Sequence, residues 1–341
     1  MKALELHTSQ SLENLRLSER PRPKPGPNDV IVEMKAATLN YRDLIYLTGM
    51  MGYGADFPLP LTPLSDGAGI VVETGAAVTR VKKGDRVAPL FYQDWHSGPI
   101  TREASASTLV GPHYQGIAQE YVKLSEEGVA LIPPHLSYME AAALPCAGLT
   151  AWNAVVTRGK VKPGDWVLVQ GTGGVSLFAL QFAKAAGARV ILTSSSDEKL
   201  EKGRALGADH TINYKAEPNW AGAVLEATEG RGADIVVEIG GGETFQQSLF
   251  AIRPGGFIGF VGFVSGASAE VLLALINAQS ARIEGISIGN REEFEAMARA
   301  IAATGLRPVI DSTYAFEDYR AAFGALQAQN HMGKIGIEIA A

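Results

Sequence analysis

The chain has 341 residues, enough for two domains with separate cores, and its formal net charge of −6 at pH 7 argues against nucleic acid or an anionic membrane as a partner. Hydrophobic residues make up 46% and charged residues 19%, the balance of an ordinary globular protein. Because Cys146 is the single cysteine, no intrachain disulfide can form, and with no apolar leader at the start of the sequence we expect a cytoplasmic protein.

The first 130 or so residues have the pattern of β-structure. Short apolar runs at 30–34 and 69–73 predict strands, and glycine, proline and aspartate between them mark turns. The stretch 91–116 is long, polar and irregular, and a long loop inside a compact domain is often functional.

From residue 134 the pattern becomes helical and then alternates. Ser137 and Glu140 match a capping box ahead of an alanine-rich helix, and another helix is expected over 149–156. Strands alternating with helices predict a parallel sheet with right-handed crossovers. The expected strands are 167–169, 190–192, 235–238, 257–261 and 282–288, and the expected helices are 175–186, 197–206 and 244–251. A helix after 291, a strand near 309, a helix at 316–327 and a strand at 334–339 complete the chain.

A glycine-rich turn, residues 171–176 (GTGGVS), joins an expected strand to an expected helix. In this context backbone N–H groups at the helix N-terminus can approach a pyrophosphate, and the helix dipole favours the negative charge. Ser176 occupies the third glycine place of the G-x-G-x-x-G pattern and is small enough for close helix–strand packing. We interpret the turn as a dinucleotide site rather than as an ordinary loop.

These motifs give the sequence a resemblance that runs along nearly the whole chain. Residues 83–87 (KGDRV), 144–152 (LPCAGLTAW), 206–209 (LGAD) and 333–335 (GKI), with the glycine turn, resemble the medium-chain dehydrogenase/reductase superfamily. The resemblance implies an α/β fold: a Rossmann doubly wound parallel sheet inserted after a GroES-like β-rich domain, to which the chain returns at its C-terminus. It implies a substrate domain of residues 1–147 with 288–341, an NAD(P)-binding domain of residues 148–287, and an active site in the cleft between them.

The zinc-ligand pattern of this superfamily is incomplete here. Its zinc alcohol dehydrogenases carry a cysteine, a histidine and a second cysteine, and the corresponding positions here are Asn40, Ser65 and Cys146. A catalytic zinc needs about three protein ligands and an open position, so one thiol does not make a site. We therefore predict no metal, and we interpret Cys146 as a small packing residue.

Without a Lewis acid, hydrogen-bond donors alone must polarise the acceptor. Residues 40–43 (NYRD) resemble the zinc-free quinone oxidoreductases and enoyl reductases, whose acceptors are already activated by conjugation. The expected function is NADPH-dependent hydride transfer to a quinone, an enone, an enal or a related carbonyl compound. Two alternatives stay open: an alcohol or aldehyde dehydrogenase that holds zinc through other ligands, and a non-catalytic NADPH-binding protein.

The end of the second Rossmann strand favours NADPH over NADH. NAD-preferring folds place an acid there for the ribose 2′-hydroxyl, and this chain has Ser194, followed by Ser195. The resemblance to quinone oxidoreductases implies that Lys199 and Tyr214 contact the 2′-phosphate. Asp197 lies at the start of a predicted helix and is expected to cap it, so it does not argue for NAD.

Other cofactor contacts follow from position in the resemblance. We expect Thr150 near the nicotinamide, backbone contacts around Gly240, and nicotinamide contacts from the segment after the fifth strand and from the C-terminal segment. The predicted cofactor residues besides Ser194, Ser195, Lys199 and Tyr214 are Thr150, Gly171, Gly173, Gly174, Val175, Gly240, Val261, Gly262, Phe263, Asn330, Gly333 and Lys334.

Hydride addition to a conjugated acceptor needs a donor at the developing oxyanion and then a proton. Asn40 is the candidate amide donor, Asp43 is expected to order its loop through backbone hydrogen bonds, and Tyr53 is a candidate proton donor, with Tyr41 and Tyr46 as alternatives.

The segment 282–288 should form an edge of the Rossmann sheet. An unpaired edge is a liability that pairing with a second copy removes, so we expect a homodimer acting on a small-molecule substrate.

Overall fold

The computed structural model describes residues 1–8, 10–50 and 57–340 of the chain. The chain divides into two compact units: the first unit comprises residues 1–149 and 289–341, and the second unit comprises residues 150–288. These boundaries fall one or two residues from those expected from the sequence. In the described part of the chain, no helix has the length and apolar character needed to cross a bilayer.

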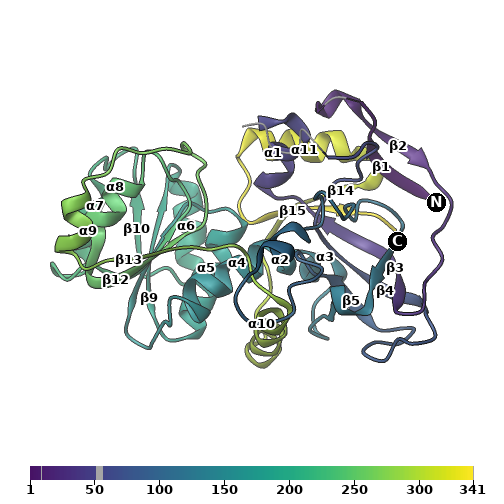
Figure 1. Cartoon of the computed structure of the whole chain (residues 1–341). Coiled ribbons are helices and arrows are strands. Elements are labelled where there is room, and N and C mark those ends of the chain that lie inside the picture. Colours follow the sequence, from purple (N-terminus) through teal and green to yellow (C-terminus); the bar gives the residue numbers. More distant parts are fainter. Residues whose placement is uncertain (9, 51–56, 341) are drawn as a thin grey trace. The chain divides into compact units, whose positions relative to one another are not determined.

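The second unit is a parallel sheet with helices on both faces (Figure 1). Its strands are β8 (Trp166–Gln170), β9 (Arg189–Ser194), β10 (His210–Asn213), β11 (Ala233–Glu238), β12 (Ile252–Phe260) and β13 (Arg282–Gly285). Its helices are α5 (Gly174–Ala185), α6 (Asp197–Ala205), α7 (Trp220–Ala227), α8 (Phe245–Ala251) and α9 (Leu273–Ala278). This confirms the predicted doubly wound fold.

The strand order β10-β9-β8-β11-β12-β13 explains where a ligand would bind. β8 and β11 are adjacent and parallel, and every residue of both strands is buried because helices cover both faces. The chain leaves β8 toward β9 on one side and leaves β11 toward β12 on the other. The carboxyl ends of β8 and β11 therefore form the topological switch point, where open α/β sheets bind ligands.

The first unit is built around one mixed sheet in the order β14-β15-β3-β4-β5-β7, with β6 also paired to β3. Its strands are β1 (Lys2–Leu6), β2 (Leu15–Glu19), β3 (Asp29–Thr38), β4 (Asp66–Thr74), β5 (Arg86–Pro89), β6 (Tyr121–Ser125), β7 (Val129–Leu131), β14 (Ile310–Ala315) and β15 (Lys334–Glu338). Its helices are α1 (Tyr41–Thr48), α2 (Arg102–Ala106), α3 (Tyr138–Ala142), α10 (Arg291–Thr304) and α11 (Tyr319–Ala328).

The C-terminal return expected from the sequence is present. β15 pairs antiparallel with β3, with Gly336 opposite Thr38, and brings Lys334 beside the end of β3. A core of β-strand side chains, α1 and α11 fills this unit. The sheet thereby joins segments that lie about three hundred residues apart in the sequence.

Some elements differ from the sequence predictions. The helix expected over 149–156 is interrupted: α4 (Leu149–Trp152) lies between the π-helical segments Leu144–Gly148 and Asn153–Thr157. The alanine-rich sequence favours helix, but Pro145 and Gly148 disturb its regular bonding. The capping box of Ser137 and Glu140 is confirmed at the start of α3. Strand β10 and helices α7 and α9 are present in the structure but were not predicted, and α1 and α2 form in stretches that were expected to be loops.

Candidate functional site

The glycine turn between β8 and α5 has the geometry of an anion cradle. Gly171 has φ +70°, a conformation that favours glycine, and Gly173 is the N-cap of α5 with no side chain capping the helix. A Cβ added at Gly173 would meet no atom within 4 Å. The first turn of α5, which includes Gly174 and Val175, therefore opens onto free space, as pyrophosphate binding requires.

Ser176 keeps α5 close to β8 in the place of a third glycine. Its hydroxyl donates a 2.7 Å hydrogen bond to the backbone carbonyl of Gln170, the last residue of β8, and its side chain is buried. The expected close packing of helix and strand is confirmed, with the serine hydroxyl satisfied locally.

Glu238, at the end of β11, is the centre of a buried polar network. Its carboxylate oxygens accept hydrogen bonds from the backbone N–H groups of Gly240 and Gly241, the hydroxyls of Thr244 and Ser248, and the side-chain amide of Gln170. All five donors are neutral, so the charge is stabilised by dipoles gathered at the switch point. The network ties the ends of β8 and β11 to the first turns of α8.

The same network holds the predicted cofactor segments after β11 and β12. The N–H of Gly240 bonds to Glu238 and Gln170, so this N–H is already used within the protein. The backbone carbonyl of Glu238 accepts from the N–H groups of Val261 and Gly262, at 2.8 and 3.2 Å. Phe263 follows directly, and its carbonyl accepts from Gly266. Both loops thus have a fixed backbone at the carboxyl edge of the sheet.

The end of β9 carries hydroxyl groups and lacks an acid. Ser194 is buried, and its hydroxyl accepts a 3.3 Å hydrogen bond from the N–H of Ser196, the N-cap of α6. Ser195 lies between these two residues, and the N–H of Tyr214 bonds to the Ser194 carbonyl at 3.1 Å. Tyr214 is therefore held against the strand end, with 42% of its surface exposed.

α6 supplies the remaining predicted groups at this corner. Lys199 lies in its first turn, and its N–H donates to the Ser196 hydroxyl. Asp197 begins the helix and accepts a 2.7 Å hydrogen bond from the Asn213 amide. The N-cap of α6 is Ser196, so Asp197 does not cap the helix as expected but lies in its first turn, where the helix dipole favours an acid.

In the first unit, a second group of polar side chains surrounds the Lys334 ammonium. Its Nζ donates to the Leu39 carbonyl at 2.6 Å, to Asn40 Oδ1 at 2.5 Å and to Asp66 Oδ2 at 3.2 Å. Lys334 and Asp66 are both buried, and the hydroxyl of Thr38 also faces Asp66 Oδ2. Lys334 was predicted by resemblance alone and Asp66 was not predicted, although an acid just ahead of the apolar run 68–72 was a usable signal.

Asn40 and Asp43 lie at the start of α1, beside this group. Asn40 is the N-cap, and Asp43 Oδ2 accepts its backbone N–H at 2.8 Å, so Asp43 orders the turn as predicted. Tyr46, one turn further, stacks on Phe57 and lies under the Arg42 guanidinium. Tyr53 lies outside the described residues.

Burial raises the pKa of Asp43 to about 6, against the opposing effect of Arg42. The neutral carboxyl therefore stabilises the folded state below the unfolded pKa near 3.8, and this stabilisation is lost as the pH rises through 6. Asparagine stays neutral at every pH, so it does not lose this stabilisation. We therefore expect the free energy of unfolding of Asp43→Asn, relative to that of wild type, to rise by up to about 3 kcal/mol from pH 4 to pH 7. Chemical unfolding at both pH values measures the difference, and a pH-independent difference would contradict it.

The donor set beside Lys334 does not fit zinc. Asn40 Oδ1 is occupied by the ammonium, and Ser65 offers an alcohol. Cys146 is the single thiol of the chain, and one thiol does not make a zinc site. Within residues 1–8, 10–50 and 57–340, no group of three or more His, Cys, Asp or Glu side chains could hold a metal ion.

The remaining predicted cofactor residues belong to separate elements of the two units. Thr150 lies in α4, and Asn330 is an exposed residue between α11 and β15. Gly333 has φ +91°, and a Cβ there would lie 2.3 Å from the Val309 carbonyl, so glycine is required for the backbone path.

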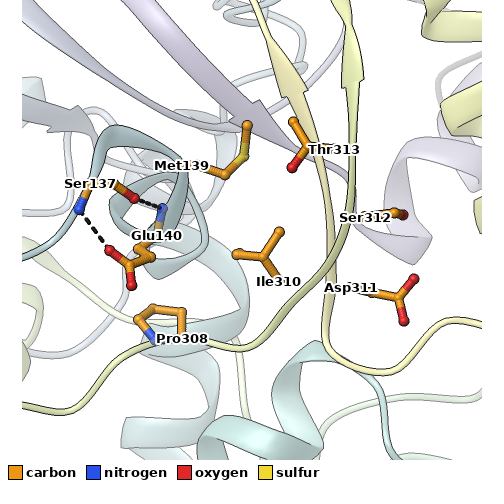
Figure 2. A pocket seen from close by; sticks show the side chains of 8 residues that line it. All are labelled: Ser137, Met139, Glu140, Pro308, Ile310, Asp311, Ser312 and Thr313. Carbon is orange, nitrogen blue, oxygen red and sulfur yellow. Dashed lines mark hydrogen bonds between the residues drawn. The ribbon is translucent and has the colours of Figure 1, made fainter.

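A separate hollow of about 550 Å³ lies in the first unit between the start of α3 and β14 (Figure 2). Glu140, on one side, is bonded to the Ser137 N–H and to Arg307. Asp311, on the other side, accepts the Met332 N–H. Because the carboxylates of Glu140 and Asp311 are both bonded within the protein, we assign no ligand to this hollow.

The comparisons with known proteins agree with this geometry. Residues 26–134 match the alcohol dehydrogenase GroES-like domain model, and residues 174–303 match the zinc-binding dehydrogenase model. A zinc-type alcohol dehydrogenase-like protein of Schizosaccharomyces pombe is 43% identical to this chain, and the match covers 93% of this chain and 92% of the relative.

Solved structures are similar along the whole chain. A Sinorhizobium meliloti structure, provisionally assigned as an alcohol dehydrogenase, is 42% identical, with a TM-score of 0.91 and 99% of both chains covered. The Escherichia coli quinone oxidoreductase complexed with NADPH is 26% identical, with a TM-score of 0.82, covering 99% of this chain and 100% of its own.

A GroES-like β unit with an inserted Rossmann unit and an open glycine cradle defines an NAD(P)-dependent oxidoreductase. This chain belongs to the medium-chain dehydrogenase/reductase superfamily, among its zinc-type alcohol dehydrogenase-like and quinone oxidoreductase-like members.

Proposed function

We propose that this protein is an NADPH-dependent reductase of activated acceptors, namely quinones, enones or enals, that works without catalytic zinc. The observation that carries the proposal is the Lys334 ammonium, which is bonded to Asn40 and Asp66 among the residues at the zinc-ligand positions of related dehydrogenases. A buried cation bonded there disfavours a second cation.

The bound cofactor would supply a hydride. Hydride addition to a conjugated acceptor places negative charge on the acceptor oxygen, which then needs a hydrogen-bond donor and finally a proton. Asn40 provides the candidate donor, because its side-chain Nδ2 is buried without a partner among the described residues. A conjugated acceptor is the class that such donors can activate without a Lewis acid.

The second unit supports the choice of NADPH. The glycine cradle would hold the pyrophosphate, and Ser194, Ser195, Lys199 and Tyr214 lie around the end of β9, where the ribose 2′-phosphate is expected. The NADPH complex of the Escherichia coli quinone oxidoreductase supports the same assignment.

A paired titration of NADPH and NADH, followed by nicotinamide fluorescence on metal-analysed protein, tests the cofactor. We expect NADPH to bind at least about tenfold tighter, a difference of about 1.4 kcal/mol, with zinc well below one per chain. Lys199→Gln should weaken NADPH binding severalfold and leave NADH binding unchanged. The control is Lys202→Gln: the Lys202 side chain pairs with Glu198, and its replacement should affect the binding of neither nucleotide.

The outcomes separate the alternatives. Equal affinity for NADH, or stoichiometric zinc, would favour an alcohol or aldehyde dehydrogenase. Tight NADPH binding without turnover of any quinone, enone or enal would favour a non-catalytic NADPH-binding protein. Turnover of one acceptor class by zinc-free protein supports the proposal.

We also propose a homodimer formed through β13. This strand is the edge of the parallel sheet, all four of its residues are exposed, and Ile283 adds an apolar side chain to it. We expect a dimer by light scattering at micromolar concentration and a monomer for Ile283→Lys. A monomeric wild type would contradict this assembly.

A further inference from the structure

The Lys334 ammonium has three N–H donors, and the structure supplies three acceptors for them. These are the Leu39 carbonyl, Asn40 Oδ1 and Asp66 Oδ2, at 2.6, 2.5 and 3.2 Å. Both charged partners are nearly fully buried: Lys334 is 3% exposed and Asp66 0%. A buried lysine with all its donors used is a fixed point in the structure.

This fixed point decides which way the Asn40 amide is turned. An ammonium can donate but cannot accept, so the amide atom that faces it must be Oδ1. Nδ2 lies in the same amide plane as Oδ1 and therefore points away from the ammonium. Nδ2 is enclosed by protein and has no hydrogen-bond partner within the described ranges.

An enclosed amide N–H without a partner is unfavourable unless another molecule supplies an acceptor. The oxygen of a bound acceptor substrate would supply one. The N-cap position of Asn40 on α1 and the Asp43 bond to its backbone N–H fix the main chain of the residue, while Lys334 fixes its side chain.

We infer that Lys334, held by Asp66, is a positioning residue that keeps the Asn40 amide N–H directed at the acceptor oxygen. The inference rests on the proposed reductase function and extends it. When the acceptor carbon gains a hydride from NADPH, the displaced π-electron pair moves to the acceptor oxygen, which the Asn40 N–H stabilises. The oxyanion or its conjugate carbon then takes a proton from solvent or a tyrosine, which balances the two-electron reduction and the oxidation of NADPH to NADP⁺.

The donor itself is tested by Asn40→Asp, which keeps the size and an oxygen for Lys334 but removes the N–H. We expect kcat to fall about 100-fold, as for the loss of one oxyanion donor, with the NADPH Kd unchanged within about twofold. A kcat close to wild type would overturn the role of Asn40.

The positioning role is tested by a double-mutant cycle. Lys334→Met should lower kcat about tenfold or more in the wild-type background but less than about threefold in an Asn40→Ala background, because the two residues act as one unit. Lys184→Met, which removes a lysine paired with Asp209 in the second unit, is the matched control and should leave kcat unchanged. Equal losses in both backgrounds would overturn the inference.

A readout independent of turnover uses the side-chain amide NMR signals of Asn40, assigned by their loss in Asn40→Asp. In the double variant Asp66→Asn/Lys334→Met, which removes both buried charges together, we expect these signals to shift and broaden as the amide loses its fixed orientation. Unchanged signals would overturn the inference. If wild type reduces no acceptor, the proposed function fails, while the NMR result still decides whether Lys334 orients the amide.

Discussion

Replacing Glu238 with leucine is expected to lower the free energy of unfolding by about 4 kcal/mol or more, among the largest effects of a single substitution. The carboxylate is fully buried and accepts from five donors, which lie at the ends of β8 and β11 and at the start of α8. Leucine would leave these donors inside the protein without an acceptor, at about 1–3 kcal/mol for each group that cannot find another.

The size of this loss depends on chemistry as well as volume, so Glu238→Gln is a second test. It keeps the shape but replaces one acceptor oxygen with an N–H₂ group that faces other donors. We expect a smaller loss and weaker NADPH binding, because the carboxylate also holds the N–H groups of Gly240 and Gly241.

Urea unfolding of the two variants measures both losses. The matched control is Glu243→Gln, five residues along the chain, where the side chain is exposed and a change within about 0.5 kcal/mol is expected. If Glu238→Leu and Glu243→Gln unfold at the same urea concentration, the Glu238 network does not stabilise the second unit.

Gly173→Asp is expected to abolish dinucleotide binding and leave the fold intact. Aspartate is a favoured N-cap, the backbone at Gly173 has φ −76°, and a Cβ there meets no atom within 4 Å. The apo-protein should therefore unfold at or above the wild-type temperature. A carboxylate in the cradle would repel the pyrophosphate. It should weaken NADPH binding by more than about 1,000-fold, which corresponds to about 4 kcal/mol.

Gly173→Asn separates charge from size. Asparagine is nearly isosteric with aspartate and is also a good N-cap, but it carries no charge. We expect Gly173→Asn to weaken NADPH binding by only about tenfold, because its side chain occupies space in the cradle without adding charge. Fluorescence titration and thermal unfolding of both variants measure the two effects, and equal binding by Gly173→Asp and wild type would place the pyrophosphate elsewhere.

The sequence by itself determined the Rossmann unit and its cradle, because those signals are local. An apolar strand, the turn 171–176 and an apolar helix lie within a single stretch, and the backbone needs of Gly171 and Gly173 are set by their immediate neighbours. The capping arrangement at the start of α1 is local for the same reason, because it joins the N-cap Asn40 to the carboxylate of Asp43 three residues later.

Only the tertiary structure decided the polar groups that organise each site. Lys334 meets Asn40 and Asp66 because β15 pairs with β3 after nearly three hundred intervening residues. Glu238 meets Gln170 because β8 and β11 are neighbours across a crossover. A hydrogen bond between residues distant in sequence depends on strand order and register, and no local pattern of apolar and polar residues encodes which distant side chains will share a buried position.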